Sequence, residues 1–373
     1  MQKKIIALAV AGLMSGAAFA QSNVTIYGVV DMYYGHSSAT NNSAVRPGAK
    51  SVNALQSGGL SGSRLGFRGT EDLGGGMKAL WVYELGTLDP SVGDANNFGT
   101  DNTRQSYVGL SGNFGTFLAG RQQTQGFGWA AKYDAMGAGV LSPLGQLTDN
   151  ANPNTTIGLS ISGRDALARQ NNSFAYVLPT FVKGLTLSGV YSFGTGGENP
   201  KDNVAGTSPQ NIWGFAAEYD MGPLSVGYVH HNVNDFSGTS GTDQTENGYG
   251  LTYDFGVLKF IGSYQTSKTE ASGAGDIADV RIWNLGFRAP VTANGSVGFA
   301  YANYKDKEPA NDRKVKSWGV DYQHSLSKRT TAYVGYSRMT NGSTSNFNLL
   351  NLAAVPGNGG RESQFIGGLR HTF

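Results

Sequence analysis

Apolar and polar residues alternate with a period of two through most of the chain. The clearest run is 248–255, where Tyr249, Leu251, Tyr253 and Phe255 alternate with small or polar residues, and similar runs occupy 185–193, 213–220 and 297–302. Runs of about ten residues exceed the usual length of a soluble strand and match a tilted strand that crosses hydrocarbon. The pattern predicts long β-strands, each with one apolar and one polar face.

The connections between these runs alternate between short and long. Seven are tight and centred on Gly, Pro, Asn or Asp, and longer polar segments such as 195–210 and 341–362 lie between them. Eight long and seven short connections join sixteen strands and leave both termini on the short-turn side. The chain is therefore predicted to be all-β, a closed 16-stranded antiparallel transmembrane β-barrel. The seven tight connections are 72–76, 113–115, 180–184, 220–223, 254–256, 290–295 and 325–329.

The stretch 63–76, SRLGFRGTEDLGGG, shows what such a barrel encloses. Leu65 and Phe67 share one face of the strand, while Arg64 and Arg68 share the other. If the apolar pair faces lipid, both arginines face the lumen. A 16-stranded barrel holds a water-filled channel, in which guanidinium groups stay hydrated.

The amino terminus carries the features of a secretory signal peptide over residues 1–20. A basic head is followed by an apolar run at 5–14 and by small residues that end at Ala20, so Gln21 is the expected first residue of the mature chain. The barrel domain is then 21–373. No later apolar run approaches the 18 residues of a transmembrane helix.

Composition narrows the function further. The chain has no Cys, which excludes disulfides and thiolate chemistry. Removing residues 1–20 takes away two lysines, so 26 basic side chains balance 26 acidic ones. A neutral chain argues against a nucleic-acid partner. His230 and His231 are adjacent on a predicted strand and point to opposite faces, so no metal site or other cofactor is expected.

Several motifs, in order along the whole chain, resemble a general-diffusion outer-membrane porin of Gram-negative bacteria, of the trimeric β-proteobacterial type. That resemblance implies a homotrimer in outer-membrane lipid, a passive channel for small hydrophilic solutes and ions rather than an enzyme, and a third long loop folded into each barrel. The motifs are 24–28 (VTIYG), 63–74 (SRLGFRGTEDLG), 103–110 (TRQSYVGL), 119–121 (AGR), 169–173 (RQNNS) and the carboxy-terminal 367–373.

The resemblance also implies a basic ladder opposite acids on the third long loop, which is 124–168 here. Carried over by motif, the ladder is Arg64, Arg104 and Arg169, with Arg68 and Arg121 nearby. Alternation supports an inward Arg64 and Arg68. It does not decide Arg104, because Val108 and Leu110 share its parity, so that assignment depends on the resemblance.

The loop departs from the pattern in its acidic residues. Relatives commonly carry PEFGG, whereas this chain reads SPLGQ at 142–146, with Leu144 in place of the glutamate. The remaining acids are Asp134, Asp149 and Asp165 on the loop, and Asp31 on a lumen-facing position of the first strand. A basic ladder with a weakened acidic side favours anions.

Two other functions compete with general diffusion. One is a substrate-specific porin with a solute site that uses inward aromatic residues such as Tyr27 and Tyr33. The other is an exported β-rich adhesin or structural protein, which explains neither the alternation of loop lengths nor the terminal Phe373. That residue resembles the carboxy-terminal signature read by the outer-membrane assembly machinery. The tryptophans Trp81, Trp213, Trp283 and Trp318 fit interfacial aromatic girdles.

Overall fold

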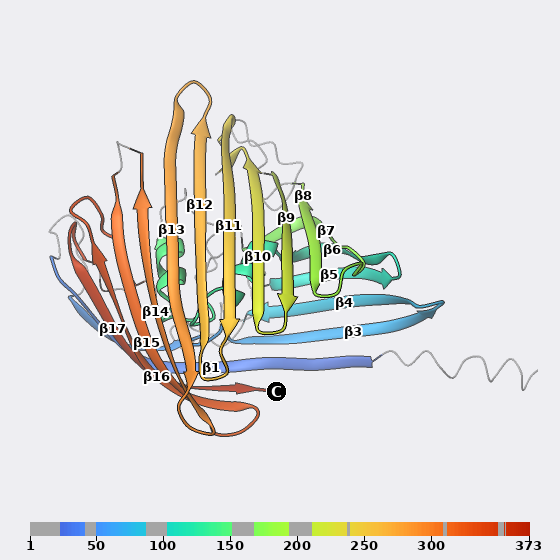
Figure 1. The fold of residues 1–373 in the computed structure, drawn as a ribbon, viewed down its shortest axis with the longest axis horizontal. Coiled ribbons are helices and arrows are strands. Elements are labelled where there is room, and N and C mark those ends of the chain that lie inside the picture. Colours follow the sequence, from blue (N-terminus) through green and yellow to red (C-terminus); the bar gives the residue numbers. More distant parts are fainter. Residues whose placement is uncertain are drawn as a thin grey trace, which may run out of the picture.

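A computed structural model describes residues 23–41, 50–86, 103–150, 168–193, 211–236, 239–308, 312–349, 354 and 356–373. These residues form one antiparallel sheet that curls into a closed barrel (Figure 1). Its first strands are β1 (Asn23–Ala39), β2 (Ser51–Ser57), β3 (Arg64–Gly74), β4 (Met77–Gly86), β5 (Thr103–Gly112), β6 (Gly115–Gln123), β7 (Arg169–Val177), β8 (Leu185–Ser192) and β9 (Asn211–Met221). The others are β10 (Leu224–Asn234), β11 (Thr242–Asp254), β12 (Lys259–Ala271), β13 (Gly275–Pro290), β14 (Gly295–Asp306), β15 (Lys314–Ser325), β16 (Thr330–Asn341) and β17 (Arg361–Thr372).

Seventeen strands occupy sixteen positions around the barrel. β1 pairs with β2 along 32–38 and with β3 along 23–29, so β2 and β3 lie end to end as one interrupted barrel strand. On its other side β1 pairs with β17, which closes the sheet. The predicted 16-stranded antiparallel barrel is confirmed.

All seven predicted tight turns connect neighbouring strands, and both ends of the described chain lie at the same rim as these turns. At the opposite rim, the prediction of eight long connections is wrong at one place. β12 and β13 are joined by the three residues 272–274, and they form a long hairpin that projects beyond the neighbouring strands (Figure 1). The strands have taken up the polar residues that a long loop would otherwise contain.

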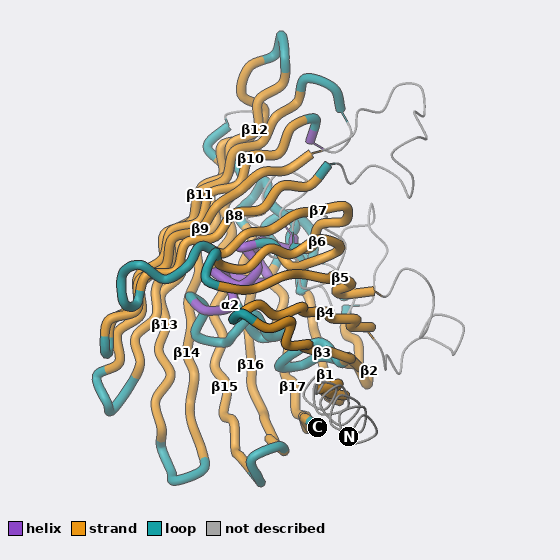
Figure 2. The backbone as a smooth tube through the Cα atoms, turned by 90° about the vertical axis from the view of Figure 1, so that its right-hand side faces the viewer, coloured by secondary structure: helices purple, strands orange, loops and turns teal. Residues whose placement is uncertain are grey.

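The described part of the third long loop lies inside the barrel (Figure 2). Its helices are α2 (Gln125–Lys132) and α3 (Pro143–Asn150). α2 contacts β8, β9 and β10, whereas α3 contacts β13, β14 and β15. The loop thus crosses from β6 and covers the inner wall on the far side.

Strand glycines allow this close approach. A Cβ atom on Gly250 would lie 2.2 Å from the Tyr133 ring, and one on Gly227 would lie 2.5 Å from the Tyr133 hydroxyl. Gly335 makes the same space for Leu141, at 2.1 Å. These glycines lie on the polar face of the alternating pattern, and the loop packs directly against them. The apolar core of the molecule lies between the loop and the barrel wall.

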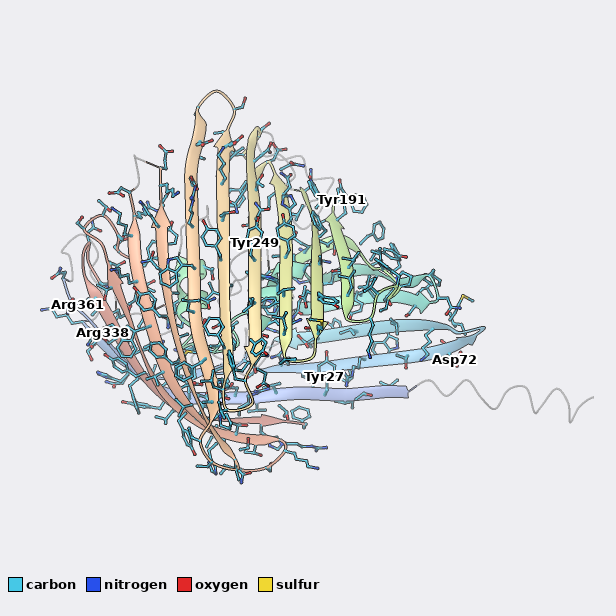
Figure 3. All side chains as sticks on the ribbon, in the orientation of Figure 1. Tyr27, Asp72, Tyr191, Tyr249, Arg338 and Arg361 are labelled. Atoms are coloured by element: carbon cyan, nitrogen blue, oxygen red, sulfur yellow. The ribbon has the colours of Figure 1, made fainter. Side chains whose placement is uncertain are left out.

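The outer wall is apolar and aromatic. Tyr191 and Tyr249 (Figure 3), Trp213 and Trp283 all point outward and are 38–50% exposed. Within the described residues, no helix has the length and apolarity needed to span a membrane.

Candidate functional site

The inner face of β3–β7 carries the predicted basic residues, and we name it the arginine wall. Arg64 opens β3, and Arg104 of β5 forms an ion pair with Glu84 of β4, at 2.7 Å between Nε and Oε1. The Tyr27 hydroxyl donates to the other Glu84 oxygen at 3.0 Å. Arg64 and Arg104 are close enough to repel each other, and Glu84 attracts both.

A bulge explains the orientation of Arg104. Glu84 pairs with Gln105, but the next residue, Leu85, pairs with Thr103. Arg104 is therefore an extra residue at which strict alternation is interrupted. Its side chain turns inward to Glu84, and a Cβ atom on Gly62 would lie 3.2 Å from its Nη1.

Arg169 and Arg121 extend the basic cluster beyond β5. The Arg169 guanidinium stacks on the ring of Phe127 in α2, at 4.8 Å from the centroid, and feels the charges of Arg104 and Arg121. Arg121 lies at a second bulge and donates to the Thr103 carbonyl and the Asn171 side chain, each at 2.6 Å. Arg169 thus stands where the arginine wall meets the inward loop.

Arg68 and Arg370 add charge on either side of Arg64. Arg68 lies on the same face of β3 as Arg64, four residues closer to the turn rim, and is exposed. Its guanidinium carbon lies 5.1 Å from the centroid of the Tyr27 ring. Arg370 pairs in register with Asp31 and influences Arg64 electrostatically, and its buried Nε has no hydrogen-bond partner among the described residues. The sequence analysis overlooked Arg370 and Glu84. Arg370 is paired with the inward Asp31, and Glu84 is paired with Gly66, which shares the inward face of Arg64, so correct strand pairing would have placed both in the lumen.

Asp31 faces inward as alternation predicts, but it is fully buried. One carboxylate oxygen accepts backbone N–H bonds from Leu60 and Ser61 at 2.8 and 2.9 Å, and the other accepts from the Tyr333 hydroxyl. Asp31 thereby holds the 58–63 interruption between β2 and β3 against the wall. The Gly59 carbonyl of that segment accepts a bond from the third long loop, so the interruption also supports the loop.

Asp134 braces the loop internally and does not lie open to the lumen. Its carboxylate accepts from the backbone N–H of Met136 and Ala138 and from the Ser142 hydroxyl. Burial raises the pKa of the Asp134 carboxyl, although these hydrogen bonds oppose the shift. Asp149 is the penultimate residue of α3, and its side chain lies outside the described part of the structure, as does Asp165.

The two unusual residues of the 142–146 motif both fasten the loop. Leu144 is completely buried among residues of the loop and of the inner wall that the loop covers, which we call the covered wall (β9–β16). Gln146 donates to Ser337 at 3.0 Å and accepts from Ser317 at 2.9 Å, which ties α3 to β16 and β15. This chain therefore has an apolar anchor at the position where the family pattern has a carboxylate.

Charged residues complete the attachment of the loop. Lys132 pairs with Glu218 and Asp220 of β9 at 2.6 and 3.0 Å. Arg288 of β13 pairs with Asp321 at 2.9 Å and donates to the Ala135 carbonyl of the loop. Among the side chains of the loop that the structure describes, which do not include that of Asp149, no carboxylate faces the arginine wall without a partner.

Other sequence expectations have simple outcomes. His231 is buried beneath α2 and accepts from the Gly126 N–H, whereas His230 stacks on Trp213 outside. No group of three metal-binding side chains occurs among the described residues. Tyr33 is 1% exposed, and the Tyr27 ring lies under the Arg68 guanidinium while its hydroxyl bonds to Glu84. The cleavage residues Ala20 and Gln21 lie outside the described residues.

Phe373 packs across the seam of the barrel. Its backbone N–H and carbonyl both bond to Gly28 of β1, at 3.2 and 3.1 Å. The ring covers Gly28, where a Cβ atom would come within 2.3 Å of it. The terminal aromatic residue thus closes the outer surface at the β1–β17 junction.

Comparison with known proteins agrees with this geometry. A sequence model described as Gram-negative porin matches residues 7–344. Outer membrane porin protein 32 of Delftia acidovorans is 35% identical over 378 residues, and the alignment covers the whole of both chains. An outer membrane porin protein of Bordetella pertussis is 28% identical, over 89% of this chain and 93% of the relative. A solved anion-selective porin from Comamonas acidovorans aligns with a TM-score of 0.79 and 30% identity, over 95% of this chain and all of that one.

Proposed function

The chain belongs to the Gram-negative porin family, and we propose that it forms a passive outer-membrane channel for small hydrophilic solutes and ions, with a preference for anions. The observation that carries the preference is the charge of the arginine wall. Arg64, Arg104 and Arg169 lie near one carboxylate, Glu84, which is paired with Arg104, and Arg121 adds a further positive charge near Arg104. Because fixed charges act strongly on an ion in a narrow passage, this cluster attracts anions and repels cations. The anion selectivity of the solved relative supports the same assignment.

Single-channel recording tests this function directly. The purified mature protein is added to a planar bilayer that separates unequal KCl concentrations. We expect stepwise conductance and a reversal potential close to that of chloride. A potassium-like reversal potential would keep the channel and refute the anion preference, whereas folded protein without conductance would refute the channel.

We further propose that three copies assemble in outer-membrane lipid and that the assembly machinery reads the carboxy-terminal strand through Phe373. The exposed ring beside Gly28 supports this role, because it presents an apolar group at the end of the last strand. Deleting Phe373 should lower the yield of folded trimer in the outer membrane and leave export intact. The yields are compared by cross-linking and by resistance to denaturation in detergent, with Phe373→Tyr as the control. Normal trimer yield from the truncated chain would contradict the proposal.

A further inference from the structure

A pocket of about 320 Å³ lies in the inner wall of the barrel, on the tight-turn side of Arg64. In an antiparallel pair, directly opposed residues share a face. Arg68 faces the lumen, so the residues opposed to it also face the lumen. One row across the wall consists of Thr25 (β1), Arg68 (β3), Val82 (β4) and Tyr107 (β5), and the next row toward the turns contains Thr70 (β3) and Leu80 (β4). These six inward side chains line the pocket.

The pocket contains a cation, Arg68, that has no acidic partner and no hydrogen bond among the described residues. Its guanidinium lies against the Tyr27 ring instead. Tyr27 is held by its bond to Glu84 and by contact with Gly66, where a Cβ atom would come within 2.3 Å of the ring. Contact with the ring therefore positions the guanidinium and leaves its N–H donors available to a solute.

The floor of the pocket beside Arg68 is apolar, although the lumen of a water-filled barrel is normally lined by polar residues. Val82 is directly opposed to Arg68, and Leu80 lies one row closer to the turns. Both side chains are half-buried. Leu118 of β6 extends the floor, because it leans over Gly109, where a Cβ atom would lie 2.5 Å from its Cδ2 atom. The pocket thus combines a free positive charge with an apolar surface.

Tyr107 stands at the far end of this floor. It lies two strands away from Arg68 in the same row, which separates the two backbones by about 10 Å. Its hydroxyl is within electrostatic reach of Glu84 and Arg68. The space between the guanidinium and the phenol therefore fits a flat body of about one six-membered ring, with its charged group directed at Arg68.

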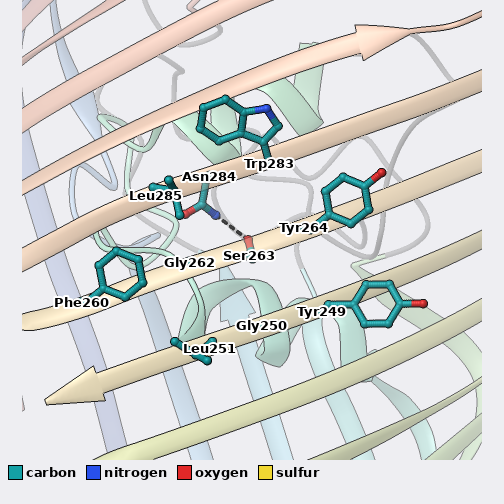
Figure 4. A pocket seen from close by; sticks show the side chains of 10 residues that line it. All are labelled: Tyr249, Gly250, Leu251, Phe260, Gly262, Ser263, Tyr264, Trp283, Asn284 and Leu285. Carbon is teal, nitrogen blue, oxygen red and sulfur yellow. Dashed lines mark hydrogen bonds between the residues drawn. The ribbon is translucent and has the colours of Figure 1, made fainter.

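A second hollow, on the outer surface of the barrel, shows how a lipid-facing depression differs from this pocket. It lies around Gly262, has a volume of about 440 Å³, and is bordered by the rings of Tyr264 and Trp283 (Figure 4). None of its described lining residues is Lys or Arg. A hollow that faces hydrocarbon needs no charge, whereas apolar side chains beside a free cation in water match a solute that has both an apolar body and a negative charge.

We infer that the lumen pocket binds an organic anion with one carboxylate on an apolar body of about one six-membered ring, of which benzoate is a simple example. The inference rests on the proposed channel, because the solute reaches the pocket through the lumen. The carboxylate accepts two parallel hydrogen bonds from Arg68, and the ring lies over Val82 and Leu80 beside Tyr107. A small inorganic anion gains nothing from the floor. Arg68 is the only cation among the described lining residues, so a dicarboxylate leaves one charge unpaired.

The test measures how benzoate changes the chloride conductance of the purified mature protein in a planar bilayer. Benzoate in the pocket obstructs the lumen, so the conductance at constant KCl should fall along a saturable curve, and the half-saturating concentration measures its affinity. Acetate has the same charge and lacks the ring. It should therefore need a concentration about tenfold higher.

Two variants separate the charge of the pocket from its floor. Arg68→Gln should weaken benzoate and acetate alike, by about tenfold, because it removes charge-assisted hydrogen bonds to the carboxylate. The floor variant, Leu80→Asn/Val82→Thr, should weaken benzoate by about tenfold and leave acetate nearly unchanged. The matched control is Val177→Thr, which alters an inward valine of β7 that does not line the pocket, and it should change neither affinity.

The outcomes distinguish the pocket from the channel. Chloride conductance that benzoate does not reduce saturably would keep the channel and overturn the inference. Equal affinities for benzoate and acetate, equally tight binding of succinate, or equal losses in the floor variant and the control would also overturn it. Saturation-transfer NMR in detergent micelles measures benzoate binding without conduction, so the pocket can be refuted even in protein that conducts no ions. Resistance to denaturation in detergent equal to that of the unmodified protein shows that the floor variant is folded.

Discussion

The two halves of the inner wall use polar residues in opposite ways. On the arginine wall of β3–β7, the guanidinium groups of Arg64 and Arg104 remain near the lumen, and a single carboxylate offsets them. On the covered wall of β9–β16, charged and amide groups such as those of Arg288 and Asn284 donate to backbone carbonyls of the loop and hold it. The difference shows that the third long loop packs on one side of the lumen, whereas the positive charge of the arginines remains on the opposite side.

Replacing Trp129 should have the largest effect, because it removes the centre of the contact between α2 and the wall that the loop covers. Trp129 is fully buried, packs on Tyr133 with 5.5 Å between centroids, and donates its indole N–H to the Gly227 carbonyl. Trp129→Ala should cost about 3–5 kcal/mol of packing free energy. We expect the loop to detach, with a larger and noisier single-channel conductance. Trp129→Phe serves as the control, and a conductance equal to that of the unmodified channel would contradict the anchoring role.

Breaking the ion pair that holds the loop should have the next largest effect. Arg288→Met leaves the Asp321 carboxylate buried without its cation and frees the Ala135 carbonyl, at a cost of about 2 kcal/mol. The loss is measured by urea denaturation and by conductance. Arg288→Met/Asp321→Leu removes both charges and should recover part of the stability. If the double variant is less stable than the single one, the pair is not the relevant contact.

Neutralising the arginine wall should change selectivity and leave stability nearly unaltered. A unit charge about 8 Å from a permeant ion in water contributes about 0.5 kcal/mol. Because each charge attracts chloride and repels potassium, Arg64→Gln/Arg104→Gln should lower the chloride-to-potassium permeability ratio by about thirtyfold, as measured from reversal potentials. Lys316→Gln/Arg338→Gln removes the same charge from the outer surface and should leave the ratio unchanged. Equal shifts in both variants would mean that the wall has no special role.

Glu84→Gln provides the smallest and most specific test. The substitution keeps an acceptor for the Tyr27 hydroxyl and removes the only carboxylate bonded to the arginine cluster among the described residues. The permeability ratio should rise by about fivefold in favour of chloride, the reverse of the arginine variant. A ratio that falls would indicate that Glu84 acts mainly by holding Arg104 in place.

Local sequence patterns were sufficient to predict most of the strands and turns of the barrel. Alternation identified the strands and the inward face of Arg64, and Gly- and Pro-rich turns located the seven hairpins at one rim. These features could be predicted because they depend on residues close in the chain, through the period-two geometry of a strand and the backbone requirements of a turn.

The tertiary structure decided what depends on residues far apart. Arg104 turns inward because β4 and β5 pair with a bulge, and Asp31 is buried because the 58–63 segment folds onto it. Asp134 and Leu144 hold the loop instead of facing the passage, since the loop seats on glycines of strands far along the chain. Strand register and loop docking are set by long-range packing, which no local period encodes.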